Sequence, residues 1–206
     1  TWKDYDGGIL KSEDFEHGTP AAEVEEYEPE VSESFEDAEY TYTFTGWTPD
    51  YEDVTRPQTY TANYSKEARS YTVSYQYDGT APVGAPALPA DEPHQYNTEV
   101  DVAAEPTLDG YRFSGWTTSD ADVSGNSFTM PAKNVTFTGS WEATEFLLTI
   151  NYVYENGTKA AEPHTEKVQC NKTYSVTSPT VDGYAADQLV VSGTMPAEPV
   201  TVTVTY

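Results

Sequence analysis

The fold is decided by a short alternating stretch, Val73-Ser74-Tyr75-Gln76-Tyr77-Asp78-Gly79, and by two further copies of its pattern. The copies are Trp2-Lys3-Asp4-Tyr5-Asp6-Gly7 and Ile150-Asn151-Tyr152-Val153-Tyr154-Glu155-Asn156-Gly157. Each copy has the alternation of a half-buried strand and ends in an Asp-Gly or Asn-Gly pair, which favours a tight hairpin turn. The sequence therefore predicts three β-modules that begin alike.

Motifs that recur in pairs support the same division. Phe44-Thr45-Gly46-Trp47-Thr48 returns as Phe113-Ser114-Gly115-Trp116-Thr117, and Thr129-Met130-Pro131-Ala132 returns as Thr194-Met195-Pro196-Ala197. A repeat length of roughly 65 to 78 residues is too long for one turn of a solenoid and suits small domains in series. Polar residues near 66/67 and 143/144 predict short connections there. The expected domains are residues 1–66, 67–143 and 144–206, which we call the first, second and third repeat.

The composition favours strands over helices. The chain is 37% hydrophobic, and it has 17 tyrosines and four tryptophans but only two methionines. Aromatic and β-branched residues suit the half-buried surface of a sheet. The predicted fold class is mainly β, with three tandem small β-grasp-like (ubiquitin-like) modules and at most one short helix in each. Modules of this size without disulfides are expected to depend on aromatic packing.

Local patterns predict the elements of each repeat. In the first repeat we expect a helix between Pro29 and Ala38, because proline suits the first helical position. Residues 80–93 are rich in proline and predict an irregular extended segment. The expected strands are residues 40–47 and 59–64 in the first repeat; 70–77, 99–102, 111–116, 127–130 and 134–141 in the second; and 147–154, 166–170, 174–176, 189–192 and 201–206 in the third.

The charge of the chain limits its partners. It has 35 acidic residues against 10 basic ones, a net charge of −25. Such a field repels phosphate backbones and anionic membranes, so no nucleic acid is expected as a partner. No apolar stretch approaches the ~20 residues that cross a bilayer, so no membrane insertion is expected. The single cysteine, Cys170, allows no internal disulfide and is expected to be a small strand residue.

The ends of the sequence suggest its context. The chain opens at Thr1-Trp2 in a predicted strand, and no signal peptide is visible. We therefore expect a monomeric fragment of a larger protein.

Three sets of motifs carry a resemblance to known families. The first repeat resembles the Listeria–Bacteroides repeat, also called the internalin B-type repeat, through residues 2–7, 18–20, 40–47 and 60–64. The second repeat is similar to the same class through residues 71–79, 110–116 and 137–141, although its proline-rich segment departs from the compact pattern. The third repeat resembles the mucin-binding-protein type of repeat through residues 153–158 and 180–184. The resemblance implies β-grasp-like folds in tandem arrays on the surface of Gram-positive bacteria, without defined catalytic or ligand residues.

A block of acidic residues is the most unusual local feature. Residues 12–55 contain 15 Asp or Glu and no Lys or Arg. One interpretation is a cation site built from Glu23, Glu25, Glu26 and Glu28, but calcium needs six to eight converging oxygens and no EF-hand spacing is present. A solvated acidic face, with weak divalent-ion association at most, is the expected outcome.

No motif predicts catalysis or a cofactor. Carboxylate pairs are so abundant that none identifies a glycosidase site. His17, His94 and His164 fall one to a repeat in polar, turn-like contexts and lack metal-binding spacing. The prediction is therefore a protein that is not an enzyme, with no catalytic residues, no metal and no cofactor, and with no ligand-binding residue assigned.

Other residue types have both functional and structural interpretations. The four tryptophans could stack on sugars, but the matched positions of Trp47 and Trp116 predict core packing, while Trp2 and Trp141 could sit at module junctions. Two further sets are the Asn-x-Ser/Thr triplets and the lysines of possible Lys–Asn isopeptide crosslinks. They are Asn63, Asn134, Asn156 and Asn171, and Lys66, Lys133, Lys159, Lys167 and Lys172.

These observations lead to one functional hypothesis and two alternatives. The chain is expected to be a non-catalytic stalk or adhesion segment, extracellular and associated with the cell surface or cell wall, which projects or supports a binding domain. Its expected partners are host glycans or surface proteins, and an elongated particle is expected in solution. The alternatives are a glycan- or mucin-binding module and an accessory region of a secreted enzyme that acts on polysaccharide.

Overall fold

The structure is a computed structural model that describes all 206 residues. It is mainly β, with 17 strands and one five-residue helix. Two compact units form within it. Unit 1 comprises Thr1–Val73, Glu92–Asp101 and Asp120–Val135, and unit 2 comprises Ser74–Asp91, Val102–Ser119 and Thr136–Tyr206. The second repeat contributes to both units, so the three predicted domain boundaries and their β-grasp character stay predictions.

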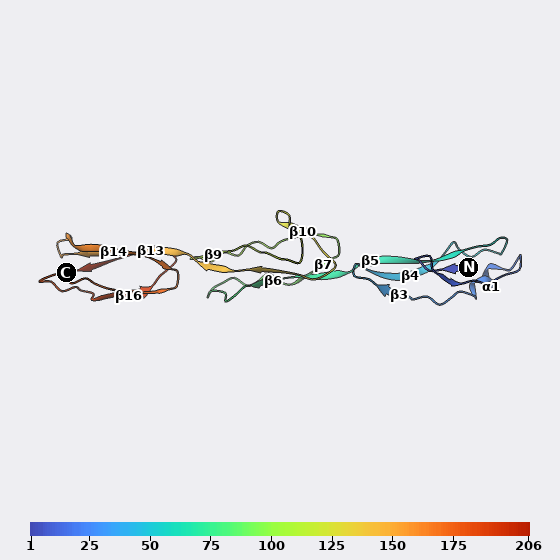
Figure 1. Ribbon diagram of the computed structural model, residues 1–206, viewed down its shortest axis with the longest axis horizontal. Coiled ribbons are helices and arrows are strands. Elements are labelled where there is room, and N and C mark those ends of the chain that lie inside the picture. Colours follow the sequence, from blue (N-terminus) through green and yellow to red (C-terminus); the bar gives the residue numbers. More distant parts are fainter. The chain divides into compact units, whose positions relative to one another are not determined.

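The first repeat forms one mixed sheet in unit 1. The order is β2-β1-β5-β4-β3, in which β1 and β5 are parallel and the other neighbours are antiparallel. Figure 1 shows β4 and β5 running side by side, and the predicted turn at Asp6-Gly7 does connect β1 to β2, with Gly7 N–H donating to Asp4 C=O. The strands are β1 (Trp2–Lys3), β2 (Ile9–Lys11), β3 (Ser34–Glu36), β4 (Tyr40–Thr48) and β5 (Tyr60–Ala68).

The helix lies earlier in the chain than predicted. Helix α1 spans Ala21–Glu25 and follows Pro20, whose fixed φ of −62° suits the residue before a helix. The prediction of a helix over Pro29 to Ala38 was wrong, because Ser34–Glu36 pairs with β4 and places the Phe35 ring 4.7 Å from that of Tyr42. Cross-strand aromatic packing therefore outweighs the helix-start preference of Pro29.

The core of the first repeat is aromatic, as expected. Trp2 is fully buried, and Trp47 and Tyr60 are nearly so, with Val24 of α1 closing the cluster. The Trp2 indole N–H donates to the Tyr51 hydroxyl at 2.8 Å. The prediction that Trp47 lies in the core is confirmed, whereas the junction position suggested for Trp2 was wrong.

The rest of unit 1 belongs to the second repeat. Strand β7 (Glu92–Gln95) pairs with residues 70–73 of β6 (Ser70–Tyr77), and β8 (Glu99–Asp101) pairs with β10 (Ser127–Thr129). The tight hairpin predicted at Asp78-Gly79 was wrong, because the proline-rich segment separates β6 from its partner β7. Much of that segment is irregular, as expected.

In unit 2, the second repeat continues with short strands. Residues 74–77 of β6 lie beside β11 (Val135–Gly139), and β9 (Tyr111–Phe113) pairs with β12 (Trp141–Ala143). The predicted strand over 111–116 ends at Phe113, and beyond its end Gly115 adopts a φ of +89°.

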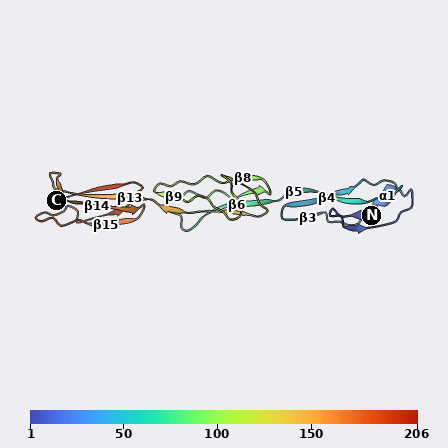
Figure 2. The same ribbon diagram turned by 45° about the horizontal axis from the view of Figure 1, so that its top comes forward.

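The third repeat packs two layers in unit 2. One sheet has the order β14-β13-β17, with β13 and β17 parallel, and β15 pairs with β16 as a second layer (Figures 1 and 2). The Asn156-Gly157 turn connects β13 to β14 as predicted, with Gly157 N–H donating to Tyr154 C=O. The strands are β13 (Glu145–Val153), β14 (Lys159–Gln169), β15 (Thr173–Thr177), β16 (Val190–Thr194) and β17 (Val200–Thr205).

The core between these layers is mainly aliphatic. Leu148, Ile150, Met195 and Val204 are fully buried there, joined by Val191 and by the rings of Tyr152 and Tyr206. The expectation that every repeat depends on aromatic packing was therefore wrong for the third. The parallel β13–β17 pair is buried on its inner face, which explains the aliphatic alternation of its sequence.

Candidate functional site

The connections between repeats are shorter than the sequence predicted. Only Arg69 separates β5 from β6 in unit 1, and only Thr144 separates β12 from β13 in unit 2. In each connecting residue, both backbone groups form a hydrogen bond. Arg69 N–H donates to Glu39 C=O, and Arg69 C=O accepts from Tyr96 N–H. Thr144 N–H donates to Gly110 C=O, and Thr144 C=O accepts from Cys170 N–H. Each connection is therefore held by backbone hydrogen bonds.

Side chains reinforce the connection at Thr144. The Asn171 side-chain amide donates to the Tyr111 hydroxyl at 2.9 Å. Cys170, 5% exposed, packs against Gly110, where a Cβ would lie 3.0 Å from the Cβ atoms of both Cys170 and Ala197. Cys170 follows β14 and lies in a turn, so its prediction as a strand residue was wrong.

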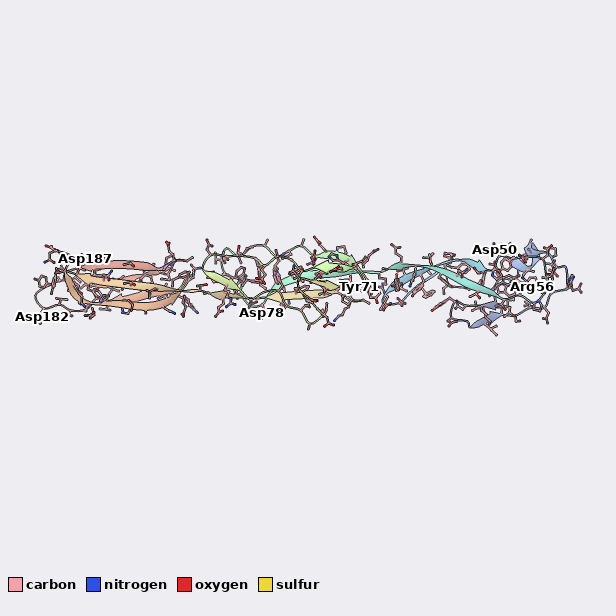
Figure 3. The ribbon with its side chains drawn as sticks, turned by 90° about the horizontal axis from the view of Figure 1, so that it is seen from above. Asp50, Arg56, Tyr71, Asp78, Asp182 and Asp187 are labelled. Atoms are coloured by element: carbon pink, nitrogen blue, oxygen red, sulfur yellow. The ribbon has the colours of Figure 1, made fainter.

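The third repeat brings its two family motifs together. Tyr154, from residues 153–158, and Tyr184, from residues 180–184, have ring centroids 4.7 Å apart. Tyr184 is 57% exposed, so much of its side chain is open to solvent. Asp182 and Asp187 lie in the same loop between β15 and β16 (Figure 3), and Asp187 fixes it by accepting from Thr205 N–H at 2.9 Å. The result is an exposed aromatic pair on an anchored loop.

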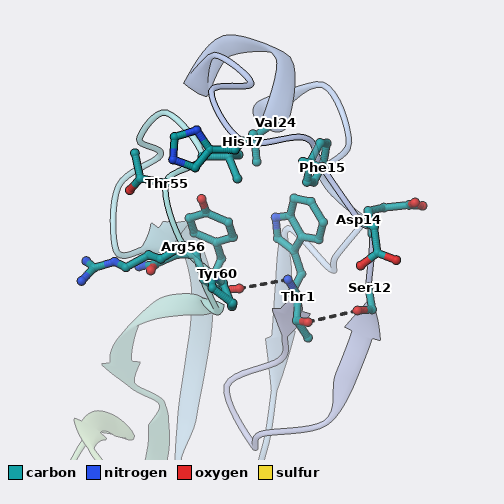
Figure 4. A pocket seen from close by; sticks show the side chains of 14 residues that line it. Thr1, Ser12, Asp14, Phe15, His17, Val24, Thr55, Arg56 and Tyr60 are labelled. Carbon is teal, nitrogen blue, oxygen red and sulfur yellow. Dashed lines mark hydrogen bonds between the residues drawn. The ribbon is translucent and has the colours of Figure 1, made fainter.

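A cavity of about 360 Å³ opens in the first repeat, within unit 1 (Figure 4). Trp2, Val24 and Tyr60 form its buried apolar wall, and His17 and Arg56 stand at its exposed rim. Arg56 lies in the loop between β4 and β5 (Figure 3). Sequence reasoning missed this cavity, because the residues that line it are far apart along the chain.

Burial perturbs the titration of groups around this cavity. Desolvation raises the pKa of Tyr60 and lowers the pKa of the Thr1 ammonium, which donates to Gln58 C=O at 3.1 Å. Desolvation also raises the pKa of Tyr51, against the opposing effect of the Trp2 indole N–H that it accepts. These tyrosines stay neutral at physiological pH and act as packing and hydrogen-bonding groups.

The predicted acidic cluster does not converge on a cation. Glu23, Glu25, Glu26 and Glu28 are exposed side chains on and just after α1, while Val24 between them faces the core. No group of three or more His, Cys, Asp or Glu side chains is placed to hold a metal ion. Weak association of divalent ions with this acidic face stays a prediction.

The histidines do not share one kind of environment. His17 is exposed in a turn, as expected, but His94 lies in β7 and His164 in β14, so a turn context was wrong for these two. Their Nε2 atoms lie 3.9 Å from a carboxylate oxygen of Glu92 and 3.5 Å from one of Glu166, respectively. The three side chains lie in different repeats and form no common site.

The tryptophans of the second repeat are only partly buried. Trp116, the counterpart of Trp47, is half-buried, and so is Trp141. Trp116 stacks on Tyr77 with ring centroids 5.9 Å apart and donates its indole N–H to Ala104 C=O at 3.3 Å. Trp116 therefore packs against aromatic neighbours on the sheet, as predicted, but it is not fully enclosed.

The asparagines of the Asn-x-Ser/Thr triplets have structural partners. Asn63 donates to the Thr48 hydroxyl, Asn134 accepts from Thr72 N–H, and Asn156 accepts from Thr158 N–H, while Asn171 bonds to Tyr111 as described above. These contacts hold turns and neighbouring strands together.

Three of the candidate lysines contact groups other than asparagine. Lys66 lies over the Tyr40 ring, 4.3 Å from its centroid, Lys133 pairs with Asp120 at 3.2 Å, and Lys159 pairs with Glu162. Lys167 lies in β14 and Lys172 in the turn before β15. An isopeptide crosslink stays a prediction without support from these contacts.

No helix in the structure has both the length and the apolar character needed to cross a membrane.

Solved structures similar to this chain are repeats of bacterial proteins. The type 2 repeat of the mucus binding protein MUB from Lactobacillus reuteri is 19% identical, with a TM-score of 0.27, and the alignment covers 67% of this chain and 98% of that one. The SHIRT (Streptococcal High Identity Repeats in Tandem) domains 3-4 from a cell surface protein are 15% identical, with a TM-score of 0.33, and the alignment covers 66% and 96%. At these TM-scores the superpositions do not identify the fold of this chain.

A search of the curated proteins found no match. Models of two protein families match parts of the sequence, and their ranges begin at residue 71, so the resemblance of the first repeat rests on its own motifs. Residues 71–145 match the divergent InlB B-repeat domain, which is of the Listeria–Bacteroides type, and residues 148–206 match the MucBP domain.

Proposed function

We propose that this chain is a non-catalytic adhesion segment displayed outside a bacterial cell. In this proposal the third repeat binds mucin glycans, and the first and second repeats act as a spacer that projects or supports a binding domain. The observation that carries the binding role is the MucBP match, which spans residues 148–206 and thus the whole core of the third repeat. Surface display follows from the proposed binding role, because mucin is an extracellular ligand.

The exposed aromatic pair is the surface of the third repeat that best suits a sugar. Sugar rings present C–H groups that stack on aromatic faces, and Tyr184 offers an exposed face beside Tyr154. Both tyrosines belong to the motifs through which the third repeat resembles its family. Tyr184 is therefore the proposed contact residue.

The spacer role is supported by the connections at Arg69 and Thr144. A one-residue link that bonds in both directions limits bending, whereas a flexible linker would be longer and rich in glycine or serine. A spacer needs this resistance to bending within each unit.

The binding role is tested with the full chain on immobilised mucin by surface plasmon resonance. We expect binding that falls when the mucin is enzymatically stripped of its O-linked glycans. Tyr184→Ala should weaken it roughly 2- to 10-fold, because an aromatic contact contributes about 0.5–1.5 kcal/mol. The matched control is Tyr5→Ala, since Tyr5 is 55% exposed in the first repeat. Absence of binding, or an equal loss in both variants, would contradict the proposal.

A further inference from the structure

A second hollow lies in the part of the second repeat that belongs to unit 2. It is a groove of about 460 Å³ beside the β9–β12 pair, within the range of about 300–1,000 Å³ that is typical of small-ligand sites. Phe113 and Trp141, directly opposed in this pair, contribute aromatic rings to its lining. Glu105 and Asp109, from the loop before β9, contribute carboxylates.

The aromatic wall of the groove is held in place but not covered. The rings of Phe113 and Trp141 have centroids 5.0 Å apart, and both side chains are half-buried. Phe113 lies against β11 at Gly139, where a Cβ would come within 2.9 Å of its Cε2 atom. Only glycine at this position allows so close an approach, which fixes the Phe113 ring beside the groove.

The matched tryptophans of the first and second repeats differ in burial. Trp47 is 8% exposed and packs in a closed cluster, whereas its counterpart Trp116 is half-buried. Trp116 contacts Phe113, with ring centroids 4.8 Å apart, and so belongs to the aromatic cluster behind the groove. Because apolar surface left in water costs about 25 cal/mol per Å², a half-open aromatic cluster is a candidate for a partner that covers it.

The carboxylates restrict what that partner is. Glu105 is exposed, and its Oε1 atom would lie 3.2 Å from a Cβ on Gly115, so the carboxylate reaches over the groove wall. Carboxylates accept strong hydrogen bonds from hydroxyl groups. Arg112 also contributes to the lining, but the two carboxylates outnumber its single positive charge and repel anionic ligands, and the net charge of −25 adds to that repulsion. The lining therefore suits a neutral ligand with an apolar face and a hydroxyl-rich edge.

We propose that this groove binds a neutral oligosaccharide, with a sugar ring against Phe113 and Trp141 and its hydroxyls donating to Glu105 and Asp109. This inference rests on the proposed glycan-binding function but places a second site in a different repeat. Anionic sugars, sulfated or sialylated, are disfavoured.

The test uses amide and indole NMR spectra of the full chain, titrated to 10 mM with lacto-N-tetraose, cellotetraose or mannotetraose. We expect at least one of them to shift the signals of residues 105–115 and the indole N–H of Trp141. A sialylated form of lacto-N-tetraose should bind at least threefold more weakly than the neutral sugar. Equal or tighter binding of the sialylated form would overturn the proposal.

Variants separate the groove from the rest of the chain. The double variant Glu105→Gln/Asp109→Asn should weaken the neutral sugar about tenfold. Glu145→Gln is the control, because Glu145 is exposed at the start of β13 and is not part of the groove lining; it should change affinity less than twofold. Equal affinity of the double variant and the wild type would contradict the proposal that the groove binds the sugar.

The outcomes also separate this site from the third repeat. Shifts confined to residues 148–206 would overturn the groove and leave the proposed function standing. Shifts confined to residues 105–115 and Trp141 would support the groove, while failure of Tyr184→Ala to alter mucin binding would then count against the third repeat. No shift with any of the three neutral sugars would overturn the groove.

Discussion

The connection between the second and third repeats depends on the absence of a side chain at Gly110. Its φ is +80°, a conformation that costs an L-residue about 1–2 kcal/mol. A Cβ there would also lie 3.0 Å from the Cβ atoms of Cys170 and Ala197 and closer still to the Cys170 sulfur, which makes the site overpacked by about 1–3 kcal/mol. Gly110→Ala should therefore lower the free energy of unfolding of this region by roughly 2–5 kcal/mol.

Gly183→Ala is a matched control for the backbone contribution. Gly183 has a φ of +83° in the same unit, but a Cβ there would meet nothing within 4 Å. It should carry only the conformational cost of about 1–2 kcal/mol. The difference between the two variants then measures the clash with Cys170 and Ala197.

Hydrogen exchange measured by NMR is the assay, because it reports each amide separately. The backbone amides of Thr144 and Cys170 are both hydrogen-bonded across this connection. In Gly110→Ala they should exchange at least about fivefold faster than in Gly183→Ala, because the clash contributes about 1 kcal/mol or more and 1.4 kcal/mol is a tenfold change. Adding Cys170→Ala should recover part of the loss, because it removes the sulfur nearest the new methyl group. Equal exchange rates in the two glycine variants would refute the reasoning.

Three further predictions concern stability and pH. Leu148→Ala should lower the free energy of unfolding by about 2–5 kcal/mol in urea titrations followed by circular dichroism, whereas Leu147→Ala should have a small effect because Leu147 is 45% exposed; equal losses would contradict the assigned core. The backbone N–H groups of Tyr40 and Glu39 donate to the Asp37 carboxylate and hold the pKa of Asp37 below its usual value. The ionised Asp37 carboxylate therefore stabilises the fold fully at pH values above the ordinary carboxyl pKa, and this stabilisation is lost as pH falls through the lowered pKa. A carboxyl ¹³C titration with an ordinary midpoint would contradict this, and Asp37→Asn should flatten the acid limb of the stability curve. Burial raises the pKa of Tyr152 and Tyr206, so the stability that their neutral side chains provide is fully present below the ordinary tyrosine pKa of ~10 and is lost as pH rises through the raised values. A rise in tyrosinate absorbance without any loss of the circular dichroism signal of the folded state would contradict this prediction.

The sequence determined the mainly β class, the tandem arrangement of motifs and many of the strands. Alternation predicted β6 over residues 70–77, and strands β13 and β17 lie within about a residue or two of their predicted bounds. These patterns are local, because a strand with one buried face must alternate. The Asp6-Gly7 and Asn156-Gly157 turns were predictable for the same reason, since their conformation depends on the turn residues themselves.

Only the tertiary structure shows which segments pair as strands and which aromatic side chains are buried. Pro29 suited a helix start, but residues 34–36 became a strand because Phe35 packs on Tyr42 of β4. Trp47 and Trp116 occupy matched motifs, yet only Trp47 is closed in a core. Burial of an aromatic ring depends on neighbours that are distant in sequence, which a local motif does not encode.

Some features of the candidate sites were visible in the sequence, and others depend on the tertiary structure. The motifs that contain Tyr154 and Tyr184 were visible in the sequence, but their 4.7 Å contact required the fold of the third repeat. The groove beside Trp141 and the packing of Cys170 on Gly110 had no sequence signal, because each joins residues that are 26 or more positions apart. Sequence periodicity determines which face of a strand is apolar, and only the packing of whole strands determines which of those faces stays open to a ligand.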